Sequence, residues 1–352
     1  MIRDPETLNL LLDSIRQFVR ESLVPHEQEV AETDRIPEAI IARMREMGLF
    51  GLSIPEAYGG LGVTMEEEVS IAFELGRTSP AFRSLLGTNN GIGSQGIVID
   101  GTEEQKRRYL PRLASGELLS SFCLTEPDSG SDAASLKTTA VRDGEHYVLN
   151  GTKRFITNAP QAGIYTVMAR TDPAIRGAGG ISAFVVERGT PGLSLGKPDR
   201  KMGQKGAHTC DVIFDDCRVP AENLIGVENA GFACIMANFQ SERLALAVMA
   251  NMTAQLALEE SLRWAREREA FGKPIGKFQV LRHRLAEMAT QLEVSREFTY
   301  RQAAKMAAGK SVIKEISMAK NFATDVADRL TYDAVQVLGG MGYMRESLVE
   351  RL

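Results

Sequence analysis

The chain has 352 residues, of which 43% are hydrophobic and 25% are charged, and its formal net charge is −5. These values are typical of a globular protein with two or three domains, and the negative charge argues against nucleic acid or an anionic membrane as main partner. Acids interrupt the opening stretch, so it is no signal peptide, and no charge-free apolar run is long enough to predict a membrane span. The four cysteines form no CxxC pair and the four histidines lack metal-ligand spacing. We therefore expect a cytoplasmic protein without a bound metal.

Residues 1–118 have the apolar spacing of helices. The first helix is predicted to place Leu8, Ile15 and Phe18 on one face. Thr64 and Thr102 are each followed by acids, a pattern typical of helix N-caps. These features predict an all-α N-terminal domain.

The pattern changes to short β-strands over residues 119–227. TTAVRDGEHYVLNG carries alternating runs on both sides of Asp143-Gly144, which predicts a hairpin. GIYTVMART, ISAFVVERG and CDVIFDD are β-branched or aromatic runs bounded by turn residues. Helical periodicity then returns over residues 228–352. This order lacks alternating βαβ units, so we predict an α+β multidomain protein and exclude a Rossmann fold.

A turn rich in Pro, Ser, Gly and Asp follows the first predicted strand, in FCLTEPDSGSDAAS at residues 122–135. The strand is expected to run into Thr125, and Gly130 would allow a ligand to approach the backbone closely. The residue pattern alone leaves two interpretations open, a binding loop and an ordinary β-turn.

Two long motifs resemble the signatures of the acyl-CoA dehydrogenase family. CLTEPDSGSDAAS matches the first signature, and QVLGGMGYMRESLVER at residues 336–351 matches most of the second. RFITN and REREAFGKPIGKFQ lie between them in the family's order. The resemblance extends over essentially the whole chain. It implies an α-helical N-terminal domain, a barrel- or sandwich-like β domain and a C-terminal four-helix bundle, with limits at 1–118, 119–227 and 228–352.

The resemblance implies FAD as cofactor. Thr125 would bond the N5/O4 edge of the flavin ring, and Phe155, which replaces a tryptophan found in many relatives, would cover its other side. The remaining expected contacts lie on the same two motifs and on segments that reach the FAD of a neighbouring subunit. The full expected set is Phe122, Leu124, Thr125, Gly130, Ser131, Phe155, Ile156, Thr157, Arg268, Phe271, Gln279, Gln336, Gly339 and Gly340.

The family's reaction removes a proton from the acyl α-carbon and a hydride from the β-carbon, so it needs one carboxylate base. Isovaleryl- and long-chain-type relatives place that base in an "ER" pair on a middle helix, which matches FQSERLAL and identifies Glu242 as the candidate. Arg243 and Ser131 would contact the acyl-CoA. A solvated Glu242–Arg243 pair is the alternative, although adjacent residues on a helix do not face one another.

The resemblance further implies a homotetramer that passes electrons to an electron-transferring flavoprotein and acts in fatty acid β-oxidation on medium, long or branched acyl chains. An acyl-CoA oxidase and a non-catalytic acyl-CoA-binding homologue are the alternatives on this fold. The sequence ends at Leu352, where relatives continue into a segment that can hold another base, so that segment is expected to be absent here.

Overall fold

The computed structural model describes residues 2–352 of the chain and contains two compact units. Unit 1 comprises Met1–Gln28, Thr64–Pro80 and Gln240–Leu352, and unit 2 comprises Glu29–Val63 and Ala81–Phe239. Each unit therefore combines stretches that lie far apart in the sequence. The three domains expected at residues 1–118, 119–227 and 228–352 remain predictions, because the two units group residues by packing and not by their order in the chain.

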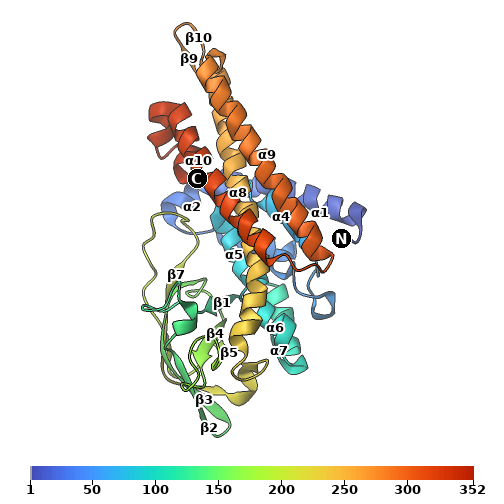
Figure 1. The fold of residues 1–352 in the computed structure, drawn as a ribbon, viewed down its shortest axis with the longest axis vertical. Coiled ribbons are helices and arrows are strands. Elements are labelled where there is room, and N and C mark those ends of the chain that lie inside the picture. The colour runs from blue at the N-terminus through green and yellow to red at the C-terminus, as the bar shows by residue number, and fades with distance from the viewer. Residues whose placement is uncertain (1) are drawn as a thin grey trace. The chain divides into compact units, whose positions relative to one another are not determined.

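Unit 2 is built around an eight-stranded sheet (Figure 1). Its strands run in the order β6-β7-β3-β2-β4-β5-β8, and β1 lies beside β4 off this path. Most neighbours are antiparallel, whereas β1 and β2 pair parallel with β4. The strands are β1 Ser120–Cys123, β2 Thr139–Asp143, β3 His146–Thr157, β4 Ile164–Arg170, β5 Ile181–Glu187, β6 Leu193–Leu195, β7 Thr209–Pro220 and β8 Leu224–Ile225.

The hairpin predicted at Asp143-Gly144 is confirmed. Strands β2 and β3 pair antiparallel with Asp143 opposite His146, and Gly144 has the left-handed φ of 60° that a tight turn favours. The expectation that the first strand runs into Thr125 is wrong, because β1 ends at Cys123. Leu124 and Thr125 therefore leave the sheet.

The sheet curls around one of its two apolar cores. Tyr147 on β3 and Phe184 on β5 have ring centroids 4.9 Å apart although β2 and β4 separate their strands in the sheet. The opposite face packs on helices, through residues such as Ile164 and Met168 of β4 with Leu110 of α7. Because side chains alternate across a strand, both faces of β4 are buried. This arrangement is the predicted barrel- or sandwich-like β part.

Helices make up the N-terminal part of the chain. They are α1 Pro5–Phe18, α2 Glu27–Thr33, α3 Glu38–Glu46, α4 Met65–Leu75, α5 Pro80–Asn90, α6 Gln95–Asp100 and α7 Glu103–Ala114. The N-caps predicted at Thr64 and Thr102 are confirmed as capping boxes, with Glu67 and Gln105 as the respective third helical residues.

Unit 1 is held together by long helices of the C-terminal part. These are α8 Gly231–Glu267, α9 Gln279–Ala307 and α10 Ile313–Leu338, followed by the short α11 Leu348–Arg351. Apolar side chains such as Leu258, Met288 and Leu330 join α8, α9 and α10, and Phe73 of α4 stacks on Tyr300 of α9. No helix among residues 2–352 is long and apolar enough to cross a membrane.

We predict that Thr102→Ala lowers the free energy of unfolding by about 1 kcal/mol, because the Gln105 N–H loses its acceptor at the start of α7. Urea denaturation measures the change. Thr290→Ala is the control, since its exposed hydroxyl only bonds a carbonyl within α9. Equal losses in the two variants would contradict the capping argument.

Candidate active site

A cavity of about 240 Å³ opens in unit 2 beside the ends of two strands of the sheet. Phe122, Leu124 and Thr125 come from the end of β1 and the residues after it, and Phe155, Ile156 and Thr157 come from the end of β3. Thr88, Ile92 and Phe239 complete the lining. The structure thus brings together six of the residues expected from the sequence to contact a flavin.

Hydrogen bonds tie the two segments to each other. The Arg154 N–H donates to the Thr125 carbonyl at 2.8 Å, and the Ser121 hydroxyl donates to the Thr157 carbonyl at 2.8 Å. The register of β3 against β7 shifts between Lys153 and Ile156, which marks a β-bulge at this point. Bulges often redirect side chains beside functional sites.

Phe155 is the most unusual residue of the cavity. Its φ is 58°, a left-handed value that is strained for an aromatic residue, and its ring remains 59% exposed. The Arg154 guanidinium lies 4.6 Å from the ring centroid and is itself held by Asp211 at 2.8 Å. Such strain persists only where the surroundings enforce it, and it concentrates at ligand sites.

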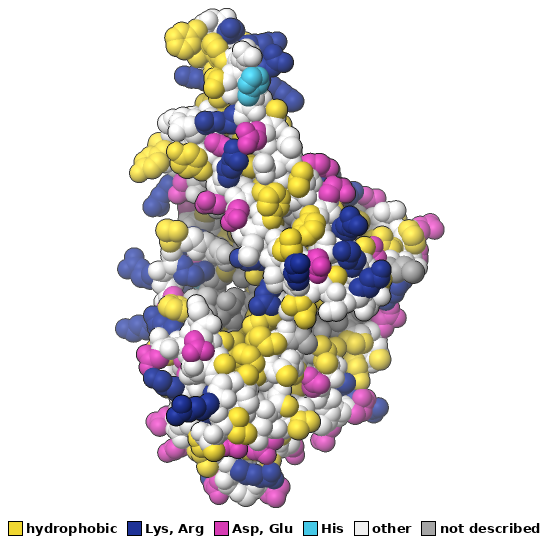
Figure 2. Space-filling model, viewed as in Figure 1, with side chains coloured by type: hydrophobic (Ala, Val, Ile, Leu, Met, Phe, Trp, Pro, Cys, Tyr) yellow, Lys and Arg dark blue, Asp and Glu magenta, His cyan; other side chains and the backbone are white. Residues whose placement is uncertain are grey.

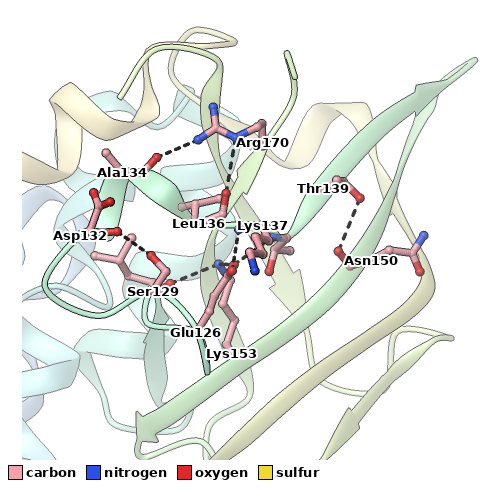
Figure 3. A network of polar contacts seen from close by, with 12 residues as sticks. Glu126, Ser129, Asp132, Ala134, Leu136, Lys137, Thr139, Asn150, Lys153 and Arg170 are labelled. Carbon is pink, nitrogen blue, oxygen red and sulfur yellow. Dashed lines mark hydrogen bonds and ion pairs between the residues drawn. The ribbon is translucent and has the colours of Figure 1, made fainter. Parts of the chain in front are cut away.

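A buried ion pair joins the two segments that line the cavity (Figure 3). The Lys153 Nζ is 2.7 Å from the Glu126 carboxylate, and both side chains are almost fully buried. The same Nζ donates to the Leu124 carbonyl at 3.3 Å. The Glu126 carboxylate also accepts the backbone N–H groups of Lys137 at 2.6 Å and Thr138 at 2.9 Å. The pair therefore connects β3 with the loop that follows β1.

The electrostatics of this pair are dominated by burial and by the donors around Glu126. Burial alone would raise the pKa of Glu126, but the Lys153 ammonium and the hydrogen bonds from Lys137 and Thr138 outweigh it and hold the pKa below its usual range. Burial lowers the pKa of Lys153, and the charge of Glu126 opposes that shift. With these partners Glu126 is ionised at neutral pH.

Gly130 and Ser131 lie outside the cavity lining, on the exposed loop that Glu126 anchors. An added Cβ at Gly130 would meet no atom within 4 Å, so open space adjoins the backbone there. The Ser129 hydroxyl donates to the Asp132 carbonyl at 2.7 Å, and the Arg170 guanidinium donates to the Ala134 carbonyl at 2.8 Å (Figure 3). These hydrogen bonds hold the backbone of the loop in place, and Ser131 is exposed on its surface.

Glu242 and Arg243 lie on α8 in unit 1, and both are partly buried. Three residues before Glu242, Phe239 belongs to the same helix and to the cavity lining of unit 2. Of the leucines that follow Glu242 and Arg243 on the same helix, Leu244 is buried and Leu246 is 44% exposed.

Arg268, Phe271 and Gln279 lie around the connection between α8 and α9. The strands β9 Glu269–Ala270 and β10 Lys273–Pro274 form a small hairpin there, and Phe271 at its turn has a φ of 54° and is 94% exposed. Arg268 and Gln279 are exposed as well. Figure 2 shows basic and apolar side chains side by side over this tip, at the top of the view.

The end of α10 carries the remaining expected contacts. Gln336 is exposed in its last turn, and Gly339 and Gly340 follow in the short helical segment Gly339–Tyr343. Gly339 has a φ of 61°, and an added Cβ at either glycine would meet open space. The two glycines therefore expose backbone at the surface of unit 1.

Sequence reasoning missed the Glu126–Lys153 pair and the residues Thr88, Ile92 and Phe239 of the cavity. A signal for the pair was present, because Glu126 follows Thr125 directly and Lys153 precedes Phe155 by two residues. Nothing in the local pattern of α5 or the loop after it marked Thr88 and Ile92, because only packing brings them to this place.

The cavity residues fit a flavin ring. Phe122, Phe155 and Ile156 offer apolar and aromatic surface to a planar ring, while the hydroxyls of Thr125 and Thr157 can donate or accept at its polar edge. By contrast, the described residues contain no group of His, Cys, Asp and Glu side chains that could hold a metal ion.

Family models match nearly all of the chain. The N-terminal, middle and C-terminal domains of acyl-CoA dehydrogenase match residues 5–117, 121–217 and 229–352. An acyl-CoA dehydrogenase of Bacillus subtilis is 43% identical over 96% of the chain and 89% of its own length. A 3-(aryl)acrylate reductase of Clostridium sporogenes is 37% identical over 99% of the chain and 92% of its own length.

Solved structures agree with this assignment. The butyryl-CoA dehydrogenase of Megasphaera elsdenii superposes with a TM-score of 0.94 at 35% identity, covering 100% of this chain and 92% of that one. A chain from the structure described as the electron transferring flavoprotein of Acidaminococcus fermentans has a TM-score of 0.94 at 39% identity, with 100% and 92% covered. A Bacillus anthracis acyl-CoA dehydrogenase complexed with FAD has a TM-score of 0.91 at 32% identity, with 99% and 63% covered.

The helical, β and helical order of the chain, its cavity and these matches agree, and the predicted fold class and FAD dependence are confirmed. The chain belongs to the acyl-CoA dehydrogenase family, whose members are FAD-dependent oxidoreductases acting on acyl-CoA.

Proposed function

We propose that this chain oxidises an acyl-CoA thioester between its α- and β-carbons and releases the trans-2-enoyl-CoA. The observation that carries the proposal is the cavity of unit 2, because its walls are formed by the two motifs expected to hold the flavin. Bound FAD would supply the hydride-accepting chemistry. Phe122, Phe155 and Ile156 would hold the ring, and Thr125 and Thr157 would orient its polar edge.

Phe155 provides a test of this site that separates binding from folding. In Phe155→Ala the ring is lost but the strained left-handed residue keeps a Cβ, whereas Phe155→Gly loses both. We predict that both variants weaken FAD binding to the deflavinated protein. We also predict that the glycine variant is more stable than the alanine variant by about 1 kcal/mol, because glycine tolerates a φ of 58°.

Fluorescence titration with FAD and urea denaturation of the deflavinated protein give the two quantities. Wild-type FAD affinity in both variants would show that Phe155 does not touch the flavin.

The proposal assigns the general base to Glu242. Its support is the match of FQSERLAL to relatives with a mid-helix base, together with the position of Glu242 on α8 three residues after the cavity residue Phe239. The carboxylate would take the α-proton, and Arg243 and Ser131 would contact the acyl-CoA.

Glu242→Gln keeps the shape of the side chain and removes the base. A positioned general base contributes roughly 10²–10⁴-fold, and we predict that anaerobic flavin reduction by a good substrate slows by at least about 10³-fold. Stopped-flow bleaching of the flavin measures this rate. FAD content should stay normal, and acyl-CoA should still perturb the flavin spectrum.

Glu267→Gln, at the exposed end of the same helix, is the matched control and should reduce its flavin at the wild-type rate. A Glu242→Gln variant that bleaches as fast as wild type would place the base elsewhere.

Arg268 is proposed to bind the pyrophosphate of the FAD held by a neighbouring subunit, with Phe271, Gln279, Gln336, Gly339 and Gly340 completing that contact. Its exposed guanidinium beside the α8–α9 tip supports this role, because a guanidinium can bind phosphate through two parallel hydrogen bonds. The chain would then act as a homotetramer built from dimers.

We predict that Arg268→Ala loses FAD and dissociates into smaller species together, as measured by flavin absorbance and light scattering during dilution. Arg301→Ala, an exposed arginine within α9, should change neither quantity. Full flavin occupancy of Arg268→Ala on dilution would contradict the assignment.

The substrate is proposed to be a medium, long or branched acyl-CoA, and the electron acceptor an electron-transferring flavoprotein. The mid-helix position of the base supports a medium, long or branched acyl chain. The name of one relative, butyryl-CoA dehydrogenase, instead favours a short chain. Another relative is named a 3-(aryl)acrylate reductase, a reduction rather than the oxidation proposed here.

One experiment separates these possibilities. The purified protein is examined for a flavin absorption band and titrated anaerobically with acyl-CoAs from butyryl to palmitoyl and with isovaleryl-CoA. Bleaching by the longer or branched members supports the proposal, and a butyryl optimum contradicts the chain length. Rapid reoxidation by O₂ identifies an oxidase, and a flavin that no acyl-CoA bleaches identifies a non-catalytic homologue.

A further inference from the structure

The buried pair Glu126–Lys153 joins the two walls of the cavity at their inner ends. Glu126 is the residue after Thr125, and Lys153 lies two residues before Phe155. Their side chains are 2.7 Å apart, with side-chain exposures of 4% and 0%. The Lys153 ammonium also reaches the Leu124 carbonyl, so it contacts the first wall at two points. This contact adds to the backbone bond from Arg154 to Thr125, which also joins the two walls.

Stability alone is a poor explanation for such a pair. Removing two charges from water costs several kcal/mol for each ion, and apolar residues of similar volume often stabilise a fold as well or better. Leu124, whose carbonyl Lys153 binds, belongs to an apolar core cluster. Unlike an apolar contact, the pair is directional. Its hydrogen bonds fix the position of the Leu124 carbonyl and of the Lys137 and Thr138 N–H groups.

The two charges also cancel each other. If Lys153 alone is replaced by an apolar residue, Glu126 keeps its two backbone donors but loses the ammonium that helps to hold its pKa down, and burial then raises that pKa. At a pH above this raised pKa, the carboxylate is an uncompensated negative charge beside the wall. A negative charge near a flavin disfavours the electron-rich reduced form, and the low dielectric of the interior preserves the effect. If Glu126 is also replaced by a neutral residue, no buried charge remains, but the ion pair that joined the two walls is still missing.

We propose that Glu126 and Lys153 are positioning residues that hold the 122–125 and 155–157 segments in register, and that their pairing sets both the affinity and the reduction potential of the bound flavin. This inference rests on the proposed function, because it takes the cavity as the flavin site. The ion pair acts through Leu124, Thr125 and Phe155 and needs no contact of its own with the cofactor.

The test compares Lys153→Met, the double variant Lys153→Met/Glu126→Gln, and the control Lys137→Met. Glutamine keeps an acceptor for the backbone N–H groups. The control removes the exposed Lys137–Asp128 pair, which lies in the same loop at 2.8 Å, and leaves the Lys137 N–H in place. For each protein, thermal unfolding of the deflavinated form, FAD affinity by titration and the potential of the bound flavin are measured.

We expect Lys153→Met to bind FAD at least about tenfold more weakly than wild type, which corresponds to about 1.4 kcal/mol, and to have a lower flavin potential at a pH where Glu126 is ionised. In the double variant FAD binding should stay weak while the potential returns toward the wild-type value. Lys137→Met should match wild type in both. If the pair were purely structural, both variants would lose thermal stability and FAD affinity. The flavin potential would then not fall in Lys153→Met and return toward the wild-type value in the double variant.

Folded Lys153→Met with wild-type affinity and potential would overturn the proposal. If Lys153→Met does not fold, the folded single variant Glu126→Gln replaces it, and wild-type affinity there overturns the proposal equally. The outcomes also separate this proposal from the assignment of the site. A wild-type chain that binds no FAD, or Phe155 variants with unchanged FAD affinity, contradicts the proposed function, whereas an effect at Phe155 with none at Lys153 contradicts only the positioning role.

Discussion

The buried contact between Lys153 and Glu126 is the interaction on which the geometry of the cavity depends. It joins the last part of β3 to the loop after β1, and the backbone bond from Arg154 to Thr125 lies directly beside it. With both ends of the cavity wall fixed, the chain can hold Phe155 in a left-handed conformation that would otherwise relax. The same carboxylate binds the backbone N–H groups of Lys137 and Thr138 at the end of the loop that carries Gly130 and Ser131.

The curled sheet supplies the rigid support for this contact. Tyr147 and Phe184 meet across two intervening strands, so the sheet closes around its own core and leaves its rim to form the cavity. Leu124 and Thr125 can line that rim because β1 ends at Cys123. A flavin ring needs a flat apolar wall with a few fixed polar atoms, and rigid strand ends provide both.

The residues proposed for chemistry and assembly lie on different structural elements. The walls of the proposed flavin cavity belong to unit 2, whereas Glu242, Arg268 and Gln336 lie on or beside the long helices of unit 1. Family membership identifies the class of reaction but leaves the substrate open. The relatives include a butyryl-CoA dehydrogenase and a 3-(aryl)acrylate reductase, so the shared fold does not by itself identify the substrate.

The sequence by itself determined the order of the elements and the class of the fold. Capping boxes at Thr64 and Thr102 and the hairpin at Gly144 are local features, in which residues a few positions apart interact, so their patterns were readable. The resemblance also predicted that the motifs around Thr125 and Phe155 form a flavin site, and the structure places both motifs around one cavity. Only the tertiary structure decided where β1 ends, that Thr88 and Ile92 line the cavity, and that Glu126 pairs with Lys153. Those contacts join residues between about 30 and 70 positions apart, and no local periodicity reports them, because the closing of the sheet brings them together.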